Sequence, residues 1–184
     1  GGAALHYFAN LPRLLPNDFK MKSEHGRGLD WPIAYQDLAP WYDRVAQEIG
    51  VSGDAKAEEI WRPAGKPYPM PPMKTFRHGE VWVKACESAG IRMVPAAVGM
   101  NSTEYKGRPA CLYDGWCHVG CPTGALSNPL VTYLAEARKR GAEVRARSTV
   151  TRVLTNKEGT RVTGVEYFDE RKRKQVQPAS VVVL

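Results

Sequence analysis

Three cysteines lie within eleven residues of this 184-residue chain, and thiolates so close together are typical of metal or cluster sites. The residues are Cys111, Cys117 and Cys121, spaced C-x5-C-x3-C and followed by Pro122. Iron–sulfur loops are often cysteine-rich runs whose last cysteine precedes a proline. Zinc sites more often combine two cysteine pairs, or one pair with two histidines, whereas this chain has one triplet; His118 could complete a zinc site. Free or disulfide-bonded cysteines are a third interpretation, and the residue types leave all three open.

An iron–sulfur site with three protein ligands suits a three-iron cluster, or a four-iron cluster with an outside ligand. We expect the three-iron form. The fourth cysteine, Cys86, shares one face of a predicted helix with Trp82 and Ala89, so we interpret it as a small core residue rather than a ligand. Four cysteines are too few for a disulfide scaffold, so their number does not decide the redox compartment.

The charge and hydropathy of the chain narrow the class of partner. The formal net charge is +7, but the basic residues are dispersed, and the densest run, residues 171–174, falls in a predicted hairpin turn. No nucleic-acid-binding motif is present, so we expect no nucleic acid partner. The chain contains no stretch of 18 apolar residues, which is the length that would predict a membrane span. The chain begins without an initiator methionine or a signal peptide and ends inside the apolar run 180–184, so we expect it to be a fragment of a larger protein.

Periodicity and capping residues predict the elements that position the cysteines. Apolar spacing predicts a helix from Leu38 to Ile49, with Pro40 near its first turn, and a second helix over residues 78–89. Asn128 and Pro129 predict the start of a third helix, which ends at Gly141. Strands are predicted over 92–98, 143–147, 149–155, 161–169 and 180–184, with a hairpin turn at 156–159. Residues 1–33 read as irregular and the proline-rich stretch 51–77 as ordered coil. The fold class is therefore α/β or, for this fragment, α+β.

Several segments follow the pattern of one enzyme family nearly from end to end. They are residues 1–8, 15–22, 30–33, 68–72, 108–125, 149–154 and 161–166. In these segments the chain resembles the glucose–methanol–choline (GMC) family of FAD-dependent oxidoreductases, most closely the flavoprotein subunit of bacterial glucose, gluconate and sorbitol dehydrogenases.

The resemblance implies a fold and a set of cofactor contacts. The chain would be the middle part of a two-domain GMC fold: 1–33 a flavin-contacting loop region, 34–106 substrate-side helices and proline-rich coil, 107–127 the cluster loop, and 128–184 a helix and strands returning to the FAD-binding domain. Flavin contacts are implied at Gly1, Gly2, His6 and Tyr7, and a backbone contact to the adenine end at Val150. The phosphate-binding loop is expected before Gly1 and the catalytic histidine beyond Leu184, so we expect no catalytic residue here and no activity of this stretch alone.

The resemblance also implies a function. We expect oxidation of the CH–OH group of a sugar, sugar acid or polyol by FAD, with electrons passing through an iron–sulfur cluster on Cys111, Cys117 and Cys121 to a cytochrome. The implied partners are a cytochrome c subunit and a small export or chaperone subunit, in the periplasm, with membrane attachment only through a partner. Two alternatives remain: a GMC alcohol oxidase-like flavoprotein without a cluster, and a metal-stabilised module that holds zinc or an iron–sulfur cluster alone.

Overall fold

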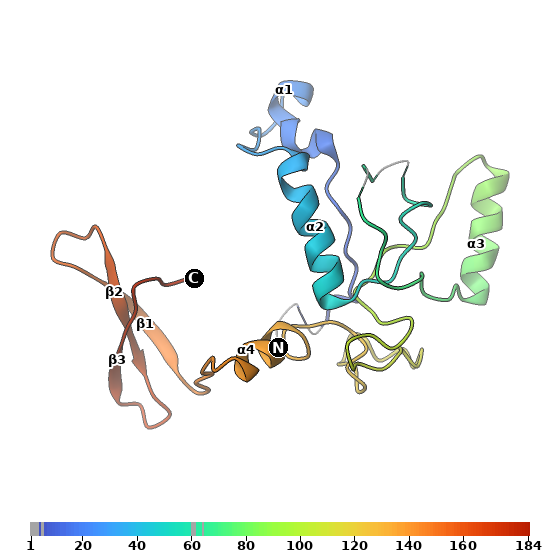
Figure 1. The fold of residues 1–184 in the computed structure, drawn as a ribbon. Coiled ribbons are helices and arrows are strands. Elements are labelled where there is room, and N and C mark those ends of the chain that lie inside the picture. Colours follow the sequence, from blue (N-terminus) through green and yellow to red (C-terminus); the bar gives the residue numbers. More distant parts are fainter. Residues whose placement is uncertain (1–3, 5, 60–61, 64) are drawn as a thin grey trace. The chain divides into compact units, whose positions relative to one another are not determined.

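The computed structural model describes residues 4, 6–59, 62, 63 and 65–184, and the chain divides into two compact units between Glu136 and Ala137. The first unit combines helices with long irregular segments, and the second is built around an antiparallel sheet (Figure 1). This mixture confirms the α+β class. The place of the chain in a two-domain architecture and the four-part division of residues 1–184 stay predictions.

Helix α2 (Tyr35–Ile49) confirms the first predicted helix and extends it by three residues at its start. Asp37 causes the earlier start, because its side chain accepts the N–H of Ala34 at 2.8 Å and caps the first turn ahead of the apolar stripe. Pro40 is therefore the sixth residue of the helix, in its second turn rather than near its first. At the other end Gly50 donates its N–H to the carbonyl of Ala46 and ends the helix, as expected.

The core of the first unit forms where α2 meets two irregular segments. Ala46, Ile49, Val51 and Ala97 are buried together there, with Leu11 and Tyr68 packed against them. Backbone hydrogen bonds join the segments, because Ser52 donates its N–H to the carbonyl of Val98 at 2.9 Å. In the described part of residues 51–77, the prediction of an ordered coil is thus confirmed.

The strand predicted at 92–98 is wrong. Only Val98 takes part in pairing, through isolated bridges to Asn10 and Ser52. Pro95 explains the difference, because a proline has no N–H to donate to a strand ladder.

Short helices occupy part of the region predicted to be irregular. A 3-10 helix, η2 (Pro16–Lys20), leads directly into α1 (Met21–His25). Local hydrogen bonds hold both: Asp18 accepts the N–H of Leu15 at 2.7 Å, and Asp30 accepts the N–H of Lys22 at 2.9 Å. These helices are too short to show apolar periodicity, so the sequence pattern could not indicate them.

Helix α3 (Arg77–Ser88) confirms the second predicted helix to within one residue at each end. None of its residues is buried, and Trp82 is 64% exposed. Cys86 is partly exposed as a free thiol. The interpretation of Cys86 as a core residue is therefore wrong for this chain, because the apolar face that it shares with Trp82 is not covered in the part that the structure describes.

Helix α4 (Tyr133–Lys139) is the third predicted helix, shortened at its start. The side chain of Asn128 accepts the N–H of Leu130 at 2.9 Å, as a capping residue does, but the next residues form turns before the helix begins. Gly141 has a φ of +89°, the left-handed conformation expected just after a helix.

The sheet of the second unit has three antiparallel strands in the order β1 (Thr149–Thr155), β2 (Val162–Phe168) and β3 (Lys174–Pro178). Both predicted turns are confirmed. Asn156 donates its N–H to the carbonyl of Arg161 at 2.9 Å between β1 and β2, and Asp169 donates its N–H to the carbonyl of Arg173 at 3.0 Å between β2 and β3. The basic run 171–174 thus lies in and just after a turn.

Two strand predictions in this unit are wrong, and one strand was not predicted. Residues 143–147 form no strand, because Arg147 adopts a φ of +52° that extended chains do not allow. Residues 180–184 form none either, and Val183 is 90% exposed rather than buried. The pairing strand is instead β3, whose polar residues gave no apolar signal. Among the helices that the structure describes, none is both long and apolar enough to cross a membrane.

Candidate functional site

One buried residue ties together the two ends of the loop that carries the three cysteines, residues 107–127, here called the cysteine loop. Asn101 is fully buried, and its amide donates to the carbonyls of Arg108 at 3.0 Å and Pro109 at 3.2 Å. Its backbone carbonyl accepts the N–H of Cys111 at 2.8 Å, and its backbone N–H donates to Ala125 at 3.1 Å. Asn101 therefore contacts both ends of the loop and closes its base.

Arg108 joins the same base to the end of helix α2. Its guanidinium donates to the carbonyls of Gly124 at 3.1 Å and Ala125 at 3.3 Å, and also to the carbonyl of Ile49. This contact places a positive charge at the carbonyl end of a helix, where a cation is favoured. Gly50 leaves the room for it, because a Cβ at that position would lie 2.9 Å from Nη2 of Arg108.

The three thiols of the cysteine loop are free and partly buried. Sγ of Cys111 accepts the N–H of Tyr113 at 3.3 Å, and Sγ of Cys121 accepts the N–H of Leu126 at 3.5 Å. N–H donors of this kind stabilise negative sulfur, which is the state that a metal or cluster ligates.

The pKa values of Cys121 and Cys117 shift in opposite directions, which reflects their different surroundings. Burial raises the pKa of Cys121, but hydrogen bonds from the hydroxyl of Thr123 and from nearby backbone N–H groups outweigh it and lower that pKa below the ordinary value. Burial and the neighbouring Cys111 and Cys121 raise the pKa of Cys117. The two neighbouring sulfurs therefore disfavour the thiolate of Cys117, and a cation placed beside it would favour that thiolate.

The type of donor fits an iron–sulfur cluster, whereas the arrangement is not that of a ready-made site. Over the described ranges, no group of three or more His, Cys, Asp or Glu side chains converges to hold a metal ion. The assignment of Cys111, Cys117 and Cys121 as ligands thus stays a prediction.

The segment predicted to contact flavin packs against this loop. Nδ1 of His6 lies 2.6 Å from the carbonyl oxygen of His118, so the ring donates its N–H to the loop. The ring of Phe8 stacks on the ring of His118, with centroids 5.7 Å apart and planes inclined by 21°. His118 follows Cys117 directly, so these two contacts bring the segment beside the cysteines.

Tyr7, in the same segment as His6, contacts the other end of the cysteine loop. Its hydroxyl donates to the backbone carbonyl of Ser127, at the far end of the cysteine loop. Burial raises the pKa of Tyr7, and the charge of Arg108 offsets this only in part. Tyr7 is therefore a neutral phenol at physiological pH and a hydrogen-bond donor.

The remaining predicted flavin contacts lie elsewhere. Gly1 and Gly2 fall outside the described residues. Val150 belongs to the second unit, where it is 53% exposed on β1, an outer strand of the described sheet. The ladder is irregular beside it, with a register shift between Val150 and Arg152. An outer strand presents backbone groups to a ligand, so this position fits a contact made through the backbone.

Sequence reasoning missed the residues that build the base of the site. Asn101 carries no periodic or motif signal of its own. Arg108 opens the segment 108–125 that follows the family pattern, and Gly50 was expected at a helix end, but neither signal indicated that these residues meet. A buried network of charged residues around Arg62 was missed as well.

Sequence comparisons relate this chain to known proteins. The model of a protein family described as "GMC oxidoreductase" matches residues 24–184 of this chain. The chain is 31% identical to the fructose dehydrogenase large subunit of Gluconobacter japonicus, over 100% of this chain and 34% of that protein. It is 33% identical to 2-methyl-1,2-propanediol dehydrogenase of Mycolicibacterium austroafricanum, over 100% of this chain and 33% of that protein. It is 27% identical to the gluconate 2-dehydrogenase flavoprotein of Pantoea cypripedii, over 100% of this chain and 35% of that protein.

The chain spans about a third of the length of these curated relatives. The family match covers all the described elements from α2 onward, including the whole cysteine loop. On this match, the chain belongs to the GMC oxidoreductase family.

Proposed function

We propose that this chain is part of an FAD-dependent dehydrogenase that oxidises the CH–OH group of a sugar, sugar acid or polyol. The match to the GMC family over residues 24–184 supports an FAD-dependent oxidoreductase. Relatives that carry the names fructose, gluconate and propanediol dehydrogenase support a polyhydroxylated small-molecule substrate. The parent protein passes its electrons through an iron–sulfur cluster on Cys111, Cys117 and Cys121 to a cytochrome.

One observation carries the electron-transfer part of the proposal. The contacts of His6 and Phe8 with His118 bring the expected flavin segment beside the cysteine loop. An alcohol dehydrogenation releases two electrons, whereas a cytochrome takes one at a time, so a one-electron centre beside the flavin would connect the two. A bound flavin would supply the hydride acceptor and a cluster the one-electron relay.

In this proposal the residues of this chain hold the site in place and take no part in the chemical step. Tyr7 is neutral and its proton is committed to Ser127, so it lines the flavin side of the site without acting as the base. His6 directs its N–H to His118 and fixes the segment against the loop. The base that takes the hydroxyl proton is expected outside this chain, so the chain alone should be inactive.

Serine substitutions in the full-length protein test the cluster assignment. Replacing Cys111, Cys117 or Cys121 should remove the iron and stop reduction of cytochrome c, while anaerobic substrate still bleaches the flavin absorption. Cys86→Ser is the matched control, because Cys86 is an equally free and partly buried thiol outside the loop. Iron analysis, visible spectra and electron paramagnetic resonance give the readouts. Equal loss of iron from the Cys86 variant, or full iron in the loop variants, would contradict the ligand set.

The mode of flavin attachment is a separate part of the proposal. We expect the parent to hold FAD non-covalently, so acid precipitation should release the flavin into the supernatant. Yellow protein pellets that keep their flavin would show a covalent link and refute this expectation.

The full-length protein also tests the oxidase-like alternative and the cellular location that we propose. We place the parent in the periplasm, bound to a membrane-anchored cytochrome c subunit and exported with a small chaperone subunit. It should remain with membranes only when the cytochrome subunit is coexpressed. A soluble full-length protein that contains no iron and whose reduced flavin is reoxidised directly by oxygen would favour the oxidase-like alternative.

A further inference from the structure

The cysteine loop contains one residue with a strained backbone. Five of residues 107–127, all of which the structure describes, have a positive φ. Four of them are glycines, which lack a Cβ and adopt this conformation without strain. They are Gly107, Gly115, Gly120 and Gly124. The fifth is Tyr113, with a φ of +59°. A left-handed backbone is unfavourable for a residue with a Cβ, and it persists only where the surrounding structure holds it.

The side chain of Tyr113 is held from outside the loop, by residues 74–76 at the end of the proline-rich coil. Its hydroxyl accepts the backbone N–H of Lys74 at 3.1 Å. Its ring meets the ring of Phe76 edge to face, with centroids 5.9 Å apart and planes inclined by 82°, an arrangement that aromatic pairs favour. Nζ of Lys74 lies 5.9 Å from the centre of the Tyr113 ring, within reach of a cation–π interaction. These contacts stabilise one position of the side chain despite the strain of its backbone.

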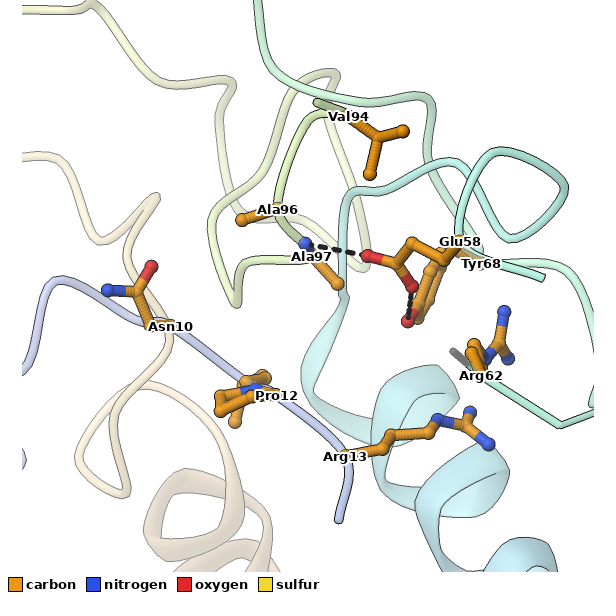
Figure 2. Close-up of a pocket in the computed structure, with 10 residues that line it drawn as sticks. Asn10, Pro12, Arg13, Glu58, Arg62, Tyr68, Val94, Ala96 and Ala97 are labelled. Carbon is orange, nitrogen blue, oxygen red and sulfur yellow. Dashed lines mark hydrogen bonds between the residues drawn. The ribbon is translucent and has the colours of Figure 1, made fainter. Parts of the chain in front are cut away.

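The coil that provides these contacts is itself fixed in the first unit. Figure 2 shows the buried side chain of Glu58, whose carboxylate accepts the hydroxyl of Tyr68 at 2.8 Å and the backbone N–H of Ala97 at 3.1 Å. Further along the coil, the carbonyl of Pro71 accepts the hydroxyl of Ser102 at 2.6 Å. The anchor is therefore part of the packed unit.

The backbone N–H of Tyr113 points at one of the three cysteine sulfurs. It donates to Sγ of Cys111 at 3.3 Å. Rotation about φ relates the peptide plane that carries this N–H to the side chain of the same residue, because the peptide unit itself is planar. With the side chain fixed by Lys74 and Phe76, the strained φ keeps the N–H on the sulfur. Release of the side chain would let φ relax to negative values and turn the N–H away.

We propose that Tyr113 is a positioning residue, through which residues 74–76 aim an N–H at the sulfur of Cys111. This role rests on the proposed function, in which Cys111 ligates an iron–sulfur cluster. A hydrogen bond to a ligand sulfur stabilises the more negative, reduced form of such a cluster and so raises its reduction potential. Residues 74–76 thus help to set the reduction potential of the electron relay.

Substitution of Tyr113 in the full-length protein tests this role. Tyr113→Ala removes the contacts of the side chain and keeps a Cβ that disfavours the left-handed backbone. Redox titration followed by electron paramagnetic resonance should then show the oxidised cluster favoured roughly tenfold, which is a potential about 59 mV lower for a one-electron couple. Tyr113→Phe loses only the bond from Lys74 and should give a smaller fall. Tyr133→Ala is the matched control, because it removes a tyrosine whose hydroxyl bonds to Glu48 outside the cysteine loop, and it should leave the potential unchanged.

A double variant shows whether Phe76 acts through Tyr113. Phe76→Ala should lower the potential of the otherwise unsubstituted protein and have no further effect in Tyr113→Ala. An equal fall in both backgrounds would mean that Phe76 acts by another route, and it would overturn the proposed positioning.

Hydrogen exchange of the Tyr113 amide, followed by mass spectrometry of the peptide that contains it, gives a readout that needs no cluster. Exchange should be roughly tenfold faster in Tyr113→Ala than in the unsubstituted protein or in Tyr133→Ala. If the unsubstituted protein holds no iron, the proposed function fails, and exchange alone decides whether Tyr113 positions this N–H. If Tyr113→Ala loses its iron, Tyr113→Phe provides the potential. The proposal is overturned if exchange at Tyr113 is unchanged in Tyr113→Ala, or if an iron-loaded Tyr113 variant keeps the potential of the unsubstituted protein.

Discussion

Replacing Gly50 by alanine tests how the end of helix α2 supports the cysteine loop. Gly50 has a φ of +79°, and a Cβ there would lie 2.8 Å from a ring carbon of Tyr105 and 2.9 Å from Nη2 of Arg108. Both neighbours hold the helix end: Tyr105 donates its hydroxyl to the carbonyl of Gln47 at 2.9 Å, and Arg108 donates to the carbonyl of Ile49. An added methyl group must displace one of them.

Two contributions make up the expected cost, and a second glycine separates them. A left-handed backbone costs an alanine about 1–2 kcal/mol. Crowding of a packed site adds about 1–3 kcal/mol. Gly50→Ala should therefore lower the free energy of unfolding by about 2–5 kcal/mol. Gly90 has a φ of +73° with nothing within 4 Å of its Cβ position, so Gly90→Ala should show only the backbone cost.

Urea unfolding of both full-length variants at neutral pH, followed by circular dichroism, measures the difference. Limited proteolysis should also cut the cysteine loop faster in Gly50→Ala than in Gly90→Ala, because Arg108 closes the base of that loop. Equal free energies of unfolding for the two variants would refute the reasoning, since the contacts with Tyr105 and Arg108 would then carry no energy.

Two further predictions concern a buried charge and a crowded strand. Burial raises the pKa of Asp43, but the hydrogen bond and charge of Arg13 outweigh it and hold that pKa below its ordinary value of 3.8. The stabilisation is therefore present at neutral pH and lost as the pH falls through the folded-state pKa. Asp43→Asn should lower the free energy of unfolding by about 3–5 kcal/mol at pH 7, against at most about 0.5 kcal/mol for Glu80→Gln in an exposed ion pair. Similar losses in the two variants would contradict this prediction. A Cβ at Gly164 would lie 2.4 Å from the carbonyl oxygen of Gln177, so Gly164→Ala should speed hydrogen exchange across β2 and β3, and unchanged exchange would count against this register.

Local signals in the sequence were sufficient for the longer helices and for the first hairpin. Helices α2 and α3 follow from apolar periodicity and from the glycines after them, and the β1–β2 hairpin follows from its turn residues. β3 could not be predicted in the same way, because it is a polar strand fixed by its neighbour rather than by its own residues. The strand predicted over 180–184 failed for the opposite reason: its residues are apolar, but no strand among the described residues pairs with them.

The sequence indicated residues of the candidate site but not the contacts that assemble them. Spacing singled out the three cysteines, and family resemblance singled out His6 and Tyr7, whose roles as ligands and flavin contacts stay predictions. The contacts that assemble them join residues far apart in the chain, such as His6 with His118. No periodicity or motif encodes a contact across 112 residues, nor the sharing of Asp43 by Arg13 and Arg62. These features depend on tertiary packing, which a single sequence does not display.

The side chains that close the carbonyl end of helix α2 also set an order of events during synthesis. The carbonyl of Ile49 accepts Arg108, 59 residues later in the chain, and Ser127, 78 residues later. At translation rates of roughly 5–20 residues per second, the helix is made about 4–16 s before its last partner exists. Until Tyr105 and Arg108 are made, the carbonyls of Gln47 and Ile49 are left to water. A pause of the ribosome between residues 50 and 127 would therefore prolong the life of a nascent chain whose helix has formed but whose cysteines have not been gathered into a closed loop.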